Sequence, residues 1–285
     1  MRRSDRRRPA LAERIRRGDD LIGLIVKMPN PALLEVAGHL GFDFALIDGE
    51  HGSADSLELE HHLRAAASVD LDVVVRVGEN APLPVLQALD SGAAGVVVPH
   101  VNDAGDATRA VAASHYPPTG SRGLAASTRA GRYSTGTLAD HLDRSRRETT
   151  VIVQIEDRRA VEHASAIAAT AQVDAVWLGP TDLSISFGQP GNPRHPDVVG
   201  AVDSIVESVT SVPGAALCVV LDDEAEIGEW KVRGASVFLF VAANLQMLRL
   251  RRLLSDAHRT VSPREAPVSP SGSRIPNRSF EGETT

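Results

Sequence analysis

Short apolar segments rich in β-branched residues alternate along the chain with longer stretches of helical periodicity. The apolar segments predict β-strands, because each is brief and is bounded by polar, Gly or Pro positions. The eight predicted strands are Leu21 to Lys27, Phe44 to Asp48, Asp72 to Arg76, Gly95 to Pro99, Val151 to Glu156, Ala175 to Gly179, Ala215 to Leu221 and Ser236 to Val241.

Helical patterns occupy the intervals between these strands. They include Pro31 to Leu40, Leu57 to Ser68, Leu83 to Ser91, Ala104 to Ser114, Arg159 to Ala169 and Asp197 to Val209. Strands alternating with helices predict parallel βαβ units, and strands that are apolar throughout are typical of a sheet covered on both faces. Eight such units in about 250 residues predict a (β/α)8 TIM barrel, an α/β fold.

The ends of the chain differ in composition from this central region. Residues 1–20 are interpreted as an N-terminal lead-in, residues 21–258 as one barrel domain, and residues 259–285 as a disordered tail rich in Pro, Ser, Gly and Arg. The basic start is not followed by a long apolar segment, so it is not read as a secretory signal.

Composition narrows the class of protein further. The formal charge of −7 argues against a nucleic-acid surface, and no apolar run reaches the ~18 residues of a membrane span. The single cysteine, Cys218, excludes an internal disulfide and favours a reducing, cytoplasmic location. We therefore expect partners to be small molecules rather than nucleic acid or membrane.

Polar side chains stand where several predicted strands end. Asp48-Gly49-Glu50-His51 follows one apolar run, and Arg76, Glu156 and Asp182 follow others. Burying such groups unpaired costs several kcal/mol each, so a core strand has no use for them. Because the carboxyl ends of barrel strands share one mouth, these residues are predicted to converge there.

The predicted cluster has the parts of an enolate-forming site. Glu156 and Asp182 offer two hard oxygen ligands for a divalent cation (Mg²⁺, Mn²⁺ or Co²⁺), which leaves positions for a chelating 2-oxo acid. Arg76 adds a fixed cation for a carboxylate or enolate oxygen. His51 is a natural general base near neutral pH, and an acid such as Asp90 could orient its imidazole.

Several motifs then give the chain a family resemblance. They are Leu46-Ile47-Asp48-Gly49-Glu50-His51, Val75-Arg76, Leu89-Asp90-Ser91-Gly92-Ala93, Tyr116-Pro117-Pro118 with Gly120-Ser121-Arg122-Gly123, Val153-Gln154-Ile155-Glu156 and Gly179-Pro180-Thr181-Asp182-Leu183-Ser184. In this order, over roughly residues 21–254, the chain resembles the HpcH/HpaI aldolases, which are class II pyruvate aldolases such as 4-hydroxy-2-oxoheptanedioate aldolase and 2-keto-3-deoxy-sugar-acid aldolases.

The resemblance implies a barrel of the phosphoenolpyruvate/pyruvate-binding type. It also implies a metal-dependent aldolase that reversibly cleaves a 4-hydroxy-2-oxo acid to pyruvate, or a close 2-oxo acid, and an aldehyde through a metal-bound enolate. By the same resemblance His51 is the proton acceptor, Asp90 raises its basicity and Arg76 stabilises the transition state.

Further site residues are carried over in the same way. Glu156 and Asp182 correspond to the metal ligands, while Gln154 and the backbone at Thr181 lie where pyruvate is held. Asp48 is predicted to bind the substrate together with them. The family's barrels usually exchange their last helix between neighbours, so the resemblance implies a homo-oligomer, a trimer or a hexamer.

Other interpretations stay open at this point. Lys27, Thr181 and Asn244 depart from the family pattern. A malyl/citramalyl-CoA-type lyase, or an altered barrel serving as a binding or assembly partner, are the alternative functions. A Schiff base on Lys27 is redundant beside a metal pair, and the candidate site residues could instead form structural ion pairs.

The longest interruption of the alternation runs from Tyr116 to Asp140 and is rich in Pro, Gly, Ser, Thr and Arg. Because it comes after the fourth predicted strand, we expect it at the catalytic mouth.

Overall fold

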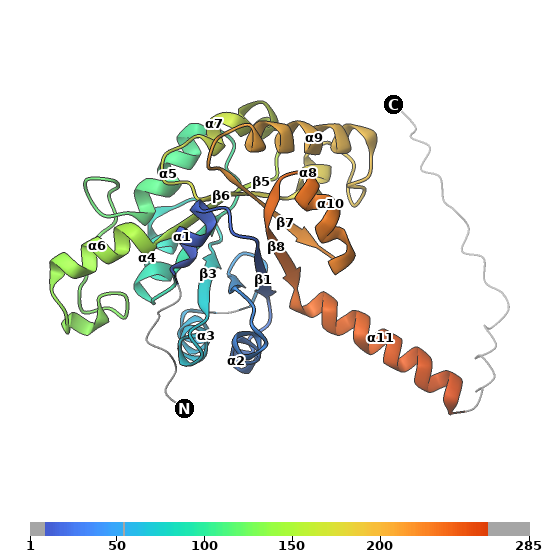
Figure 1. Ribbon diagram of the computed structural model, residues 1–285, viewed down its shortest axis with the longest axis horizontal. Helices are drawn as coiled ribbons and strands as arrows, with labels where there is room; N and C mark the ends of the chain where they lie inside the picture. Colours follow the sequence, from blue (N-terminus) through green and yellow to red (C-terminus); the bar gives the residue numbers. More distant parts are fainter. Residues whose placement is uncertain (1–8, 54, 262–285) are drawn as a thin grey trace, which may run out of the picture. The chain divides into compact units, whose positions relative to one another are not determined.

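Eight parallel strands close into a barrel in the computed structural model, which describes residues 9–53 and 55–261 (Figure 1). Each strand pairs with the next one in sequence, and β8 pairs with β1. The strands are β1 (Leu21–Val26), β2 (Phe44–Asp48), β3 (Asp72–Arg76), β4 (Gly95–Val98), β5 (Thr150–Ile155), β6 (Ala175–Leu178), β7 (Ala216–Leu221) and β8 (Ala235–Val241).

Helices connect successive strands, which confirms the predicted (β/α)8 barrel. They are α1 (Leu11–Arg16), α2 (Pro31–Leu40), α3 (Ser56–Ser68), α4 (Pro82–Asp90), α5 (Ala104–Ser114), α6 (Leu138–Glu148), α7 (Ala164–Ala168), α8 (Pro180–Ser186), α9 (Pro196–Thr210), α10 (Ile227–Val232) and α11 (Ala242–Thr260), with 3-10 turns η1 (Arg132–Ser134), η2 (Arg158–His163) and η3 (Glu224–Glu226). The helix predicted from Arg159 to Ala169 is therefore a 3-10 turn followed by a short α-helix.

The strands are apolar on both faces because each face contacts a different apolar layer. In β2, Phe44 and Leu46 point into the barrel interior, whereas Ala45 and Ile47 pack outward against the helices. At Gly23 in β1, an added Cβ would lie 2.5 Å from the Phe44 ring, so glycine makes room for that ring. Successive side chains of a strand thus build both the interior core and the outer one.

Helix α1 covers the N-terminal ends of the strands. Leu11 and Ile15, each 1% exposed, belong to the interior apolar cluster. Arg14 pairs with Asp43 at 2.7 Å, and Arg16 pairs with Asp174 at 2.7 Å, both just before a strand begins. This helix was not predicted, because residues 1–20 were interpreted only as a lead-in.

Contacts divide the chain into two compact units, residues 1–245 and 246–285. In the second unit, five apolar side chains of α11 are at least half exposed: Met247, Leu248, Leu250, Leu253 and Leu254. The predicted domain boundaries stay predictions, and most of the predicted C-terminal tail, from residue 262, lies outside the described residues, as do residues 1–8. Among described helices, none combines the length and apolarity needed to cross a membrane.

The segment from Tyr116 to Asp140 does not lie at the catalytic mouth, so that prediction was wrong. It follows α5, and this helix returns the chain from the carboxyl end of β4 towards the amino ends of the strands. Arg122, from this segment, lines a cavity together with Asp72 and Ala94, which stand at the starts of β3 and β4. A crossover helix reverses the direction of the chain, which the prediction overlooked.

Candidate active site at the barrel mouth

Asp48 and Arg76 form a buried ion pair at the carboxyl ends of β2 and β3. They are register partners, and Arg76 donates from Nε to Oδ1 at 2.9 Å and from Nη2 to Oδ2 at 2.5 Å. The guanidinium also lies 5.0 Å from the centre of the Trp177 ring. Burial alone would raise the pKa of Asp48, but the hydrogen bond and charge of Arg76 outweigh it and hold that pKa below its ordinary value.

The tetrapeptide after β2 is a tight turn built around the Asp48 carboxylate. The backbone N–H groups of Glu50 and His51 donate to Asp48 Oδ1 at 3.2 and 3.1 Å. A Cβ at Gly49 would lie 2.7 Å from the Arg76 carbonyl oxygen, so glycine is required at this approach. The turn leaves the Glu50 side chain only 10% exposed and the His51 side chain 55% exposed.

A second cluster lies beside this pair, where β4 and β5 end. Glu156 Oε1 accepts a hydrogen bond from the backbone N–H of His100 and lies 2.9 Å from His100 Nδ1. On the other side of the ring, His100 Nε2 lies 3.1 Å from Glu50 Oε1. Gln154 joins the clusters, because it accepts from Arg76 Nη1 and donates to Glu156 Oε2. One connected polar network therefore spans four neighbouring strands.

The charges of this network fit a dication. Ligand atoms of Glu50, His100 and Glu156 all lie within 4.8 Å of one another. Burial raises the pKa of Glu156 to about 7, and the charges of Glu50 and Asp182 add to this while His100 opposes it. Glu50 Oε2 is buried and accepts no hydrogen bond. Carboxylates that repel one another in a partly dry site favour protonation or a bound cation, which stabilises them.

The structure brings together most of the residues predicted for the site. Hydrogen bonds join four of them in series, from Asp48 through Arg76 and Gln154 to Glu156. His51 lies at the rim, with Nε2 3.9 Å from Glu50 Oε2.

Asp182 and Thr181 lie in the first turn of α8, next to this network. Asp182 is half-buried and close enough for its charge to raise the pKa of Glu156, whereas the Thr181 side chain is exposed. A Cβ at Gly179 would lie 2.8 Å from Glu156 Cβ, so glycine lets this carboxylate sit against the start of α8.

Asp90 is not brought to His51 within this chain. It is the last residue of α4, at the opposite end of the barrel, and its carboxylate accepts from Arg122 Nη2 at 2.6 Å. The Arg122 guanidinium is buried and lies 4.7 Å from the centre of the Tyr116 ring. The expected contact between Asp90 and the imidazole is therefore absent as an intrachain contact of the described residues.

Sequence reasoning missed two residues of the network. Glu50 was noticed as part of a motif but received no role, and His100 was not singled out. His100 follows β4 after Val98 and Pro99. The rule that polar residues after barrel strands gather at one mouth would have found it.

Lys27 also lies at this mouth, after β1. Its Nζ is 3.6 Å from Asp48 Oδ2, and its side chain is 35% exposed. An ammonium paired with a buried carboxylate and open to water lacks the apolar surroundings that activate a Schiff-base lysine.

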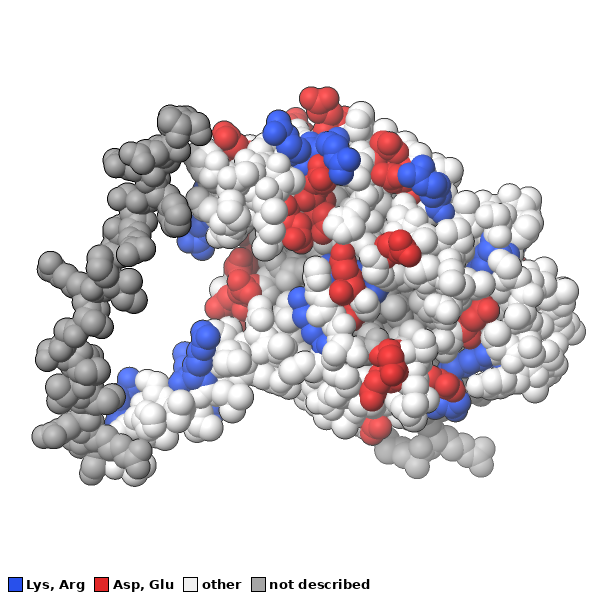
Figure 2. Space-filling model, turned by 180° about the vertical axis from the view of Figure 1, so that it is seen from behind, with Lys and Arg blue, Asp and Glu red and all other residues white. Residues whose placement is uncertain are grey.

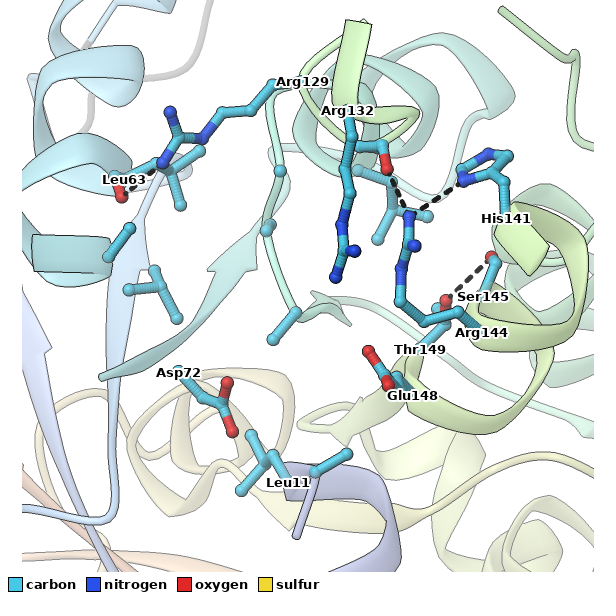
Figure 3. Close-up of a pocket in the computed structure, with 18 of the residues that line it drawn as sticks. Leu11, Leu63, Asp72, Arg129, Arg132, His141, Arg144, Ser145, Glu148 and Thr149 are labelled. Atoms are coloured by element: carbon cyan, nitrogen blue, oxygen red, sulfur yellow. Dashed lines mark hydrogen bonds between the residues drawn. The ribbon is translucent and has the colours of Figure 1, made fainter. Parts of the chain in front are cut away.

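A large cavity lies away from the mouth. It measures about 1260 Å³ and is lined by the amino-terminal start of β3, the end of α4 and the η1–α6 region. Figure 3 shows Arg132 extending into it, with Asp72 and Glu148 on the far side. Because catalytic groups of TIM barrels stand at the carboxyl ends of strands, this cavity is not the candidate active site.

Acidic and basic side chains are interspersed on the surface. On the face shown in Figure 2, acidic side chains are spread across the middle, and basic side chains lie among them rather than in one continuous patch.

Curated relatives match most of the chain. A pyruvate aldolase of Rhizobium etli is 39% identical over 193 residues, which cover 68% of this chain and 75% of the relative. A 5-keto-4-deoxy-D-glucarate aldolase of Enterobacter sp. is 35% identical over 230 residues, covering 80% of this chain and 88% of the relative.

Solved structures share the fold. An HpcH/HpaI aldolase/citrate lyase family protein from Burkholderia cenocepacia superposes with a TM-score of 0.81 at 32% identity, covering 87% of this chain and 98% of that one. The citrate synthase SbnG superposes with a TM-score of 0.79 at 29% identity, with 88% and 98% covered. The family model described as HpcH/HpaI aldolase/citrate lyase matches residues 21–245, and the chain belongs to this family.

Proposed function

We propose that this protein is a divalent-metal-dependent aldolase. It would cleave a 4-hydroxy-2-oxo acid reversibly to pyruvate, or a close 2-oxo acid, and an aldehyde. The observation that carries the proposal is the Arg76 guanidinium held beside the Glu50, His100 and Glu156 cluster at the barrel mouth. The names of the relatives, a pyruvate aldolase and a keto-deoxy-sugar-acid aldolase, support this reaction class.

Glu156 and Asp182 would hold the cation, and the Glu50 carboxylate would lie beside it. A bound Mg²⁺, Mn²⁺ or Co²⁺ supplies positive charge that polarises the keto group of a chelated 2-oxo acid. Gln154 keeps Glu156 in position by donating to its Oε2, so the carboxylate is already oriented before any ligand arrives.

Arg76 would stabilise negative charge on the substrate. Its guanidinium is 4% exposed and fixed by two hydrogen bonds to Asp48, so no side-chain motion is needed when charge develops. Asp48 itself is fully buried, and its oxygens already accept from Arg76 and two backbone N–H groups. These contacts favour positioning of Arg76 over the predicted direct contact between Asp48 and substrate.

His51 would act as the general base in the cleavage direction. It removes the proton of the hydroxyl on C4, and the bond between C3 and C4 breaks, so that C4 leaves as the aldehyde. The bonding electrons pass to the 2-oxo acid part as its enolate, which is then protonated on C3 to give pyruvate. Its half-exposed position at the rim suits a group that meets the acceptor part of the substrate. Asp90 lies at the opposite barrel end, so it could assist His51 only from a second copy of the chain. The exposed leucines of α11 support a homo-oligomer.

Chelation tests the proposal directly. We expect EDTA to abolish cleavage of 4-hydroxy-2-oxo acids, and added Mg²⁺, Mn²⁺ or Co²⁺ to restore it. Glu156→Gln should lower turnover by roughly a thousandfold, because it removes a charged ligand while keeping the shape. Glu162→Gln, an exposed change on η2, is the matched control. Full activity in EDTA, or in Glu156→Gln, would contradict the proposal.

A second candidate is a lyase that acts on a CoA thioester of a malate-like acid. The similarity to the citrate synthase SbnG and the citrate lyase part of the family description favour it. Cleavage of the carbon–carbon bond of such thioesters into a shorter acyl-CoA and a 2-oxo acid, in an assay where 4-hydroxy-2-oxo acids are not cleaved, would select this candidate over the aldolase.

A further inference from the structure

We propose that the cavity at the amino end of the barrel binds the phosphate group of a small molecule that also carries hydroxyl groups, such as a sugar phosphate. This site is separate from the mouth, and the inference does not depend on the proposed function. The cavity measures about 1260 Å³, which is ample for a small organic ligand. Four arginines are among its lining residues: Arg122, Arg129, Arg132 and Arg144.

Two of these guanidinium groups have no carboxylate partner in the part of the chain that the structure describes. Arg129 makes one long hydrogen bond, 3.4 Å from Nη2 to the Leu63 carbonyl oxygen. The Arg132 side chain forms neither a hydrogen bond nor an ion pair with any described residue, and Figure 3 shows it extending into the cavity. Because a guanidinium matches phosphate with two parallel N–H groups, both side chains are available to bind this anion.

The Arg122 guanidinium adds a buried donor to the same cavity. Its side chain is 2% exposed, and Nη2 donates to Asp90 at 2.6 Å. The Nε atom is buried as well, yet it has no hydrogen-bond partner among residues 9–53 and 55–261. Buried N–H groups are ordinarily satisfied, so an unpaired one beside a cavity indicates that an acceptor from outside the chain completes it.

An unusual backbone places Arg132 in the cavity. Arg132, Tyr133 and Ser134 have φ angles of +51°, +54° and +60°, in the left-handed region that non-glycine residues seldom adopt. Backbone hydrogen bonds hold this turn, from the Tyr133 N–H to the Thr128 carbonyl and from the Ser134 N–H to the Ala126 carbonyl. Such conformations cost about 1–3 kcal/mol each and cluster at ligand-binding sites. The turn therefore fits a role in presenting Arg132 to a ligand.

Carboxylates on the other side of the cavity limit the kind of anion that fits. Asp70, Asp72 and Glu148 also line it, and Figure 3 shows Asp72 and Glu148 across from Arg132. Carboxylates accept hydrogen bonds from hydroxyl groups but repel a second anionic group. A ligand with a phosphate group at one end and hydroxyl groups at the other therefore matches both sides.

The test measures binding of ribose 5-phosphate, inorganic phosphate and ribose to the full-length protein by isothermal titration calorimetry. Arg132→Gln and Arg129→Gln each remove one guanidinium from the cavity. Arg146→Gln is the matched control, because Arg146 lies on the same α6 region, pairs with Asp143 and is not a lining residue. Arg132 is exposed, so its substitution should leave the fold intact, and thermal unfolding of each variant checks this.

We expect one molecule of ribose 5-phosphate to bind per chain. Its Kd should rise at least about tenfold in Arg132→Gln and in Arg129→Gln and stay unchanged in Arg146→Gln. Inorganic phosphate should bind more weakly than ribose 5-phosphate, and ribose should not bind.

Three results would overturn the inference. One is that neither phosphate compound binds the wild type. Another is an unchanged Kd in folded Arg132→Gln, which would place the bound phosphate elsewhere. The third is an equal rise of Kd in Arg146→Gln, which would show that only the overall charge matters.

Discussion

Both ends of the barrel contain arginine–aspartate ion pairs, but the surroundings of these pairs differ. At the amino end, Arg14 pairs with Asp43 and Arg16 with Asp174, and these pairs fasten α1 over the interior core. At the carboxyl end, the pair of Arg76 and Asp48 is similar, but further carboxylates crowd around it.

The difference lies in the balance of charge. At the mouth, the described residues place four carboxylates, those of Asp48, Glu50, Glu156 and Asp182, beside two permanently charged cations, Arg76 and Lys27. Matched pairs stabilise a fold, whereas a surplus of buried negative charge destabilises it until a cation binds. Arginine–aspartate pairs therefore stabilise the fold at the amino end, whereas the same pair at the mouth belongs to a candidate cation site.

The largest expected effect comes from breaking the pair at the mouth. Arg76→Met leaves Asp48 buried without its partner, which should cost about 3–5 kcal/mol of unfolding free energy. Turnover should fall at least about a hundredfold, because a fixed charge at the reacting atoms is lost. Urea unfolding and steady-state kinetics measure the two effects.

Arg16→Met is the counterpart at the amino end, where the guanidinium is 39% exposed. It should lower stability without lowering turnover of the folded protein. Equal losses of turnover in the two variants would remove the distinction between the barrel ends.

The next effect concerns the apolar contacts of α1. Leu11→Ala removes a side chain that is 1% exposed in the interior core and should destabilise the protein by about 2–5 kcal/mol. Turnover per folded molecule should not change, because the mouth is at the other end. Leu57→Ala, at a position 62% exposed on α3, should stay within about 0.5 kcal/mol of the wild type. A loss of kcat in Leu11→Ala at temperatures where it is folded would show that the ends are coupled.

The smallest effect is a pH dependence at the amino end. Burial raises the pKa of Asp174 to about 6, against the opposing effects of Arg16 and the Val151 N–H. Because the folded-state pKa lies above the unfolded one, the folded state binds this proton more tightly. This proton contributes at most about 3 kcal/mol to the free energy of unfolding. The contribution is fully present below pH 3.8 and is lost as pH rises through about 6.

Asp174→Asn should remove this component. The free energy of unfolding of the wild type minus that of the variant is expected to decline as pH rises from 3.8 to 6 and to level off above it. Asp203→Asn, an exposed substitution, controls for net charge. A difference that rises over this interval would reverse the assigned sign and show that the ion pair with Arg16 outweighs burial.

Much of the barrel could be predicted from local patterns. The apolar runs of β2 and β3 are consecutive in sequence and end in polar residues, so periodicity alone located the strands and their mouth. Four predicted site residues, Asp48, Arg76, Gln154 and Glu156, meet there because parallel strands place their carboxyl ends together.

By itself the sequence therefore determined the closed barrel, its layers and the polar mouth, because these follow from the period of side chains along each strand. Only the tertiary structure decided that α1 packs into the core, that Asp90 and the Tyr116 to Asp140 segment lie at the far end, and that His100 stands between Glu50 and Glu156. The physical reason is that these placements depend on helices reversing the chain and on one left-handed backbone angle. Neither leaves a periodic signal in the residues themselves.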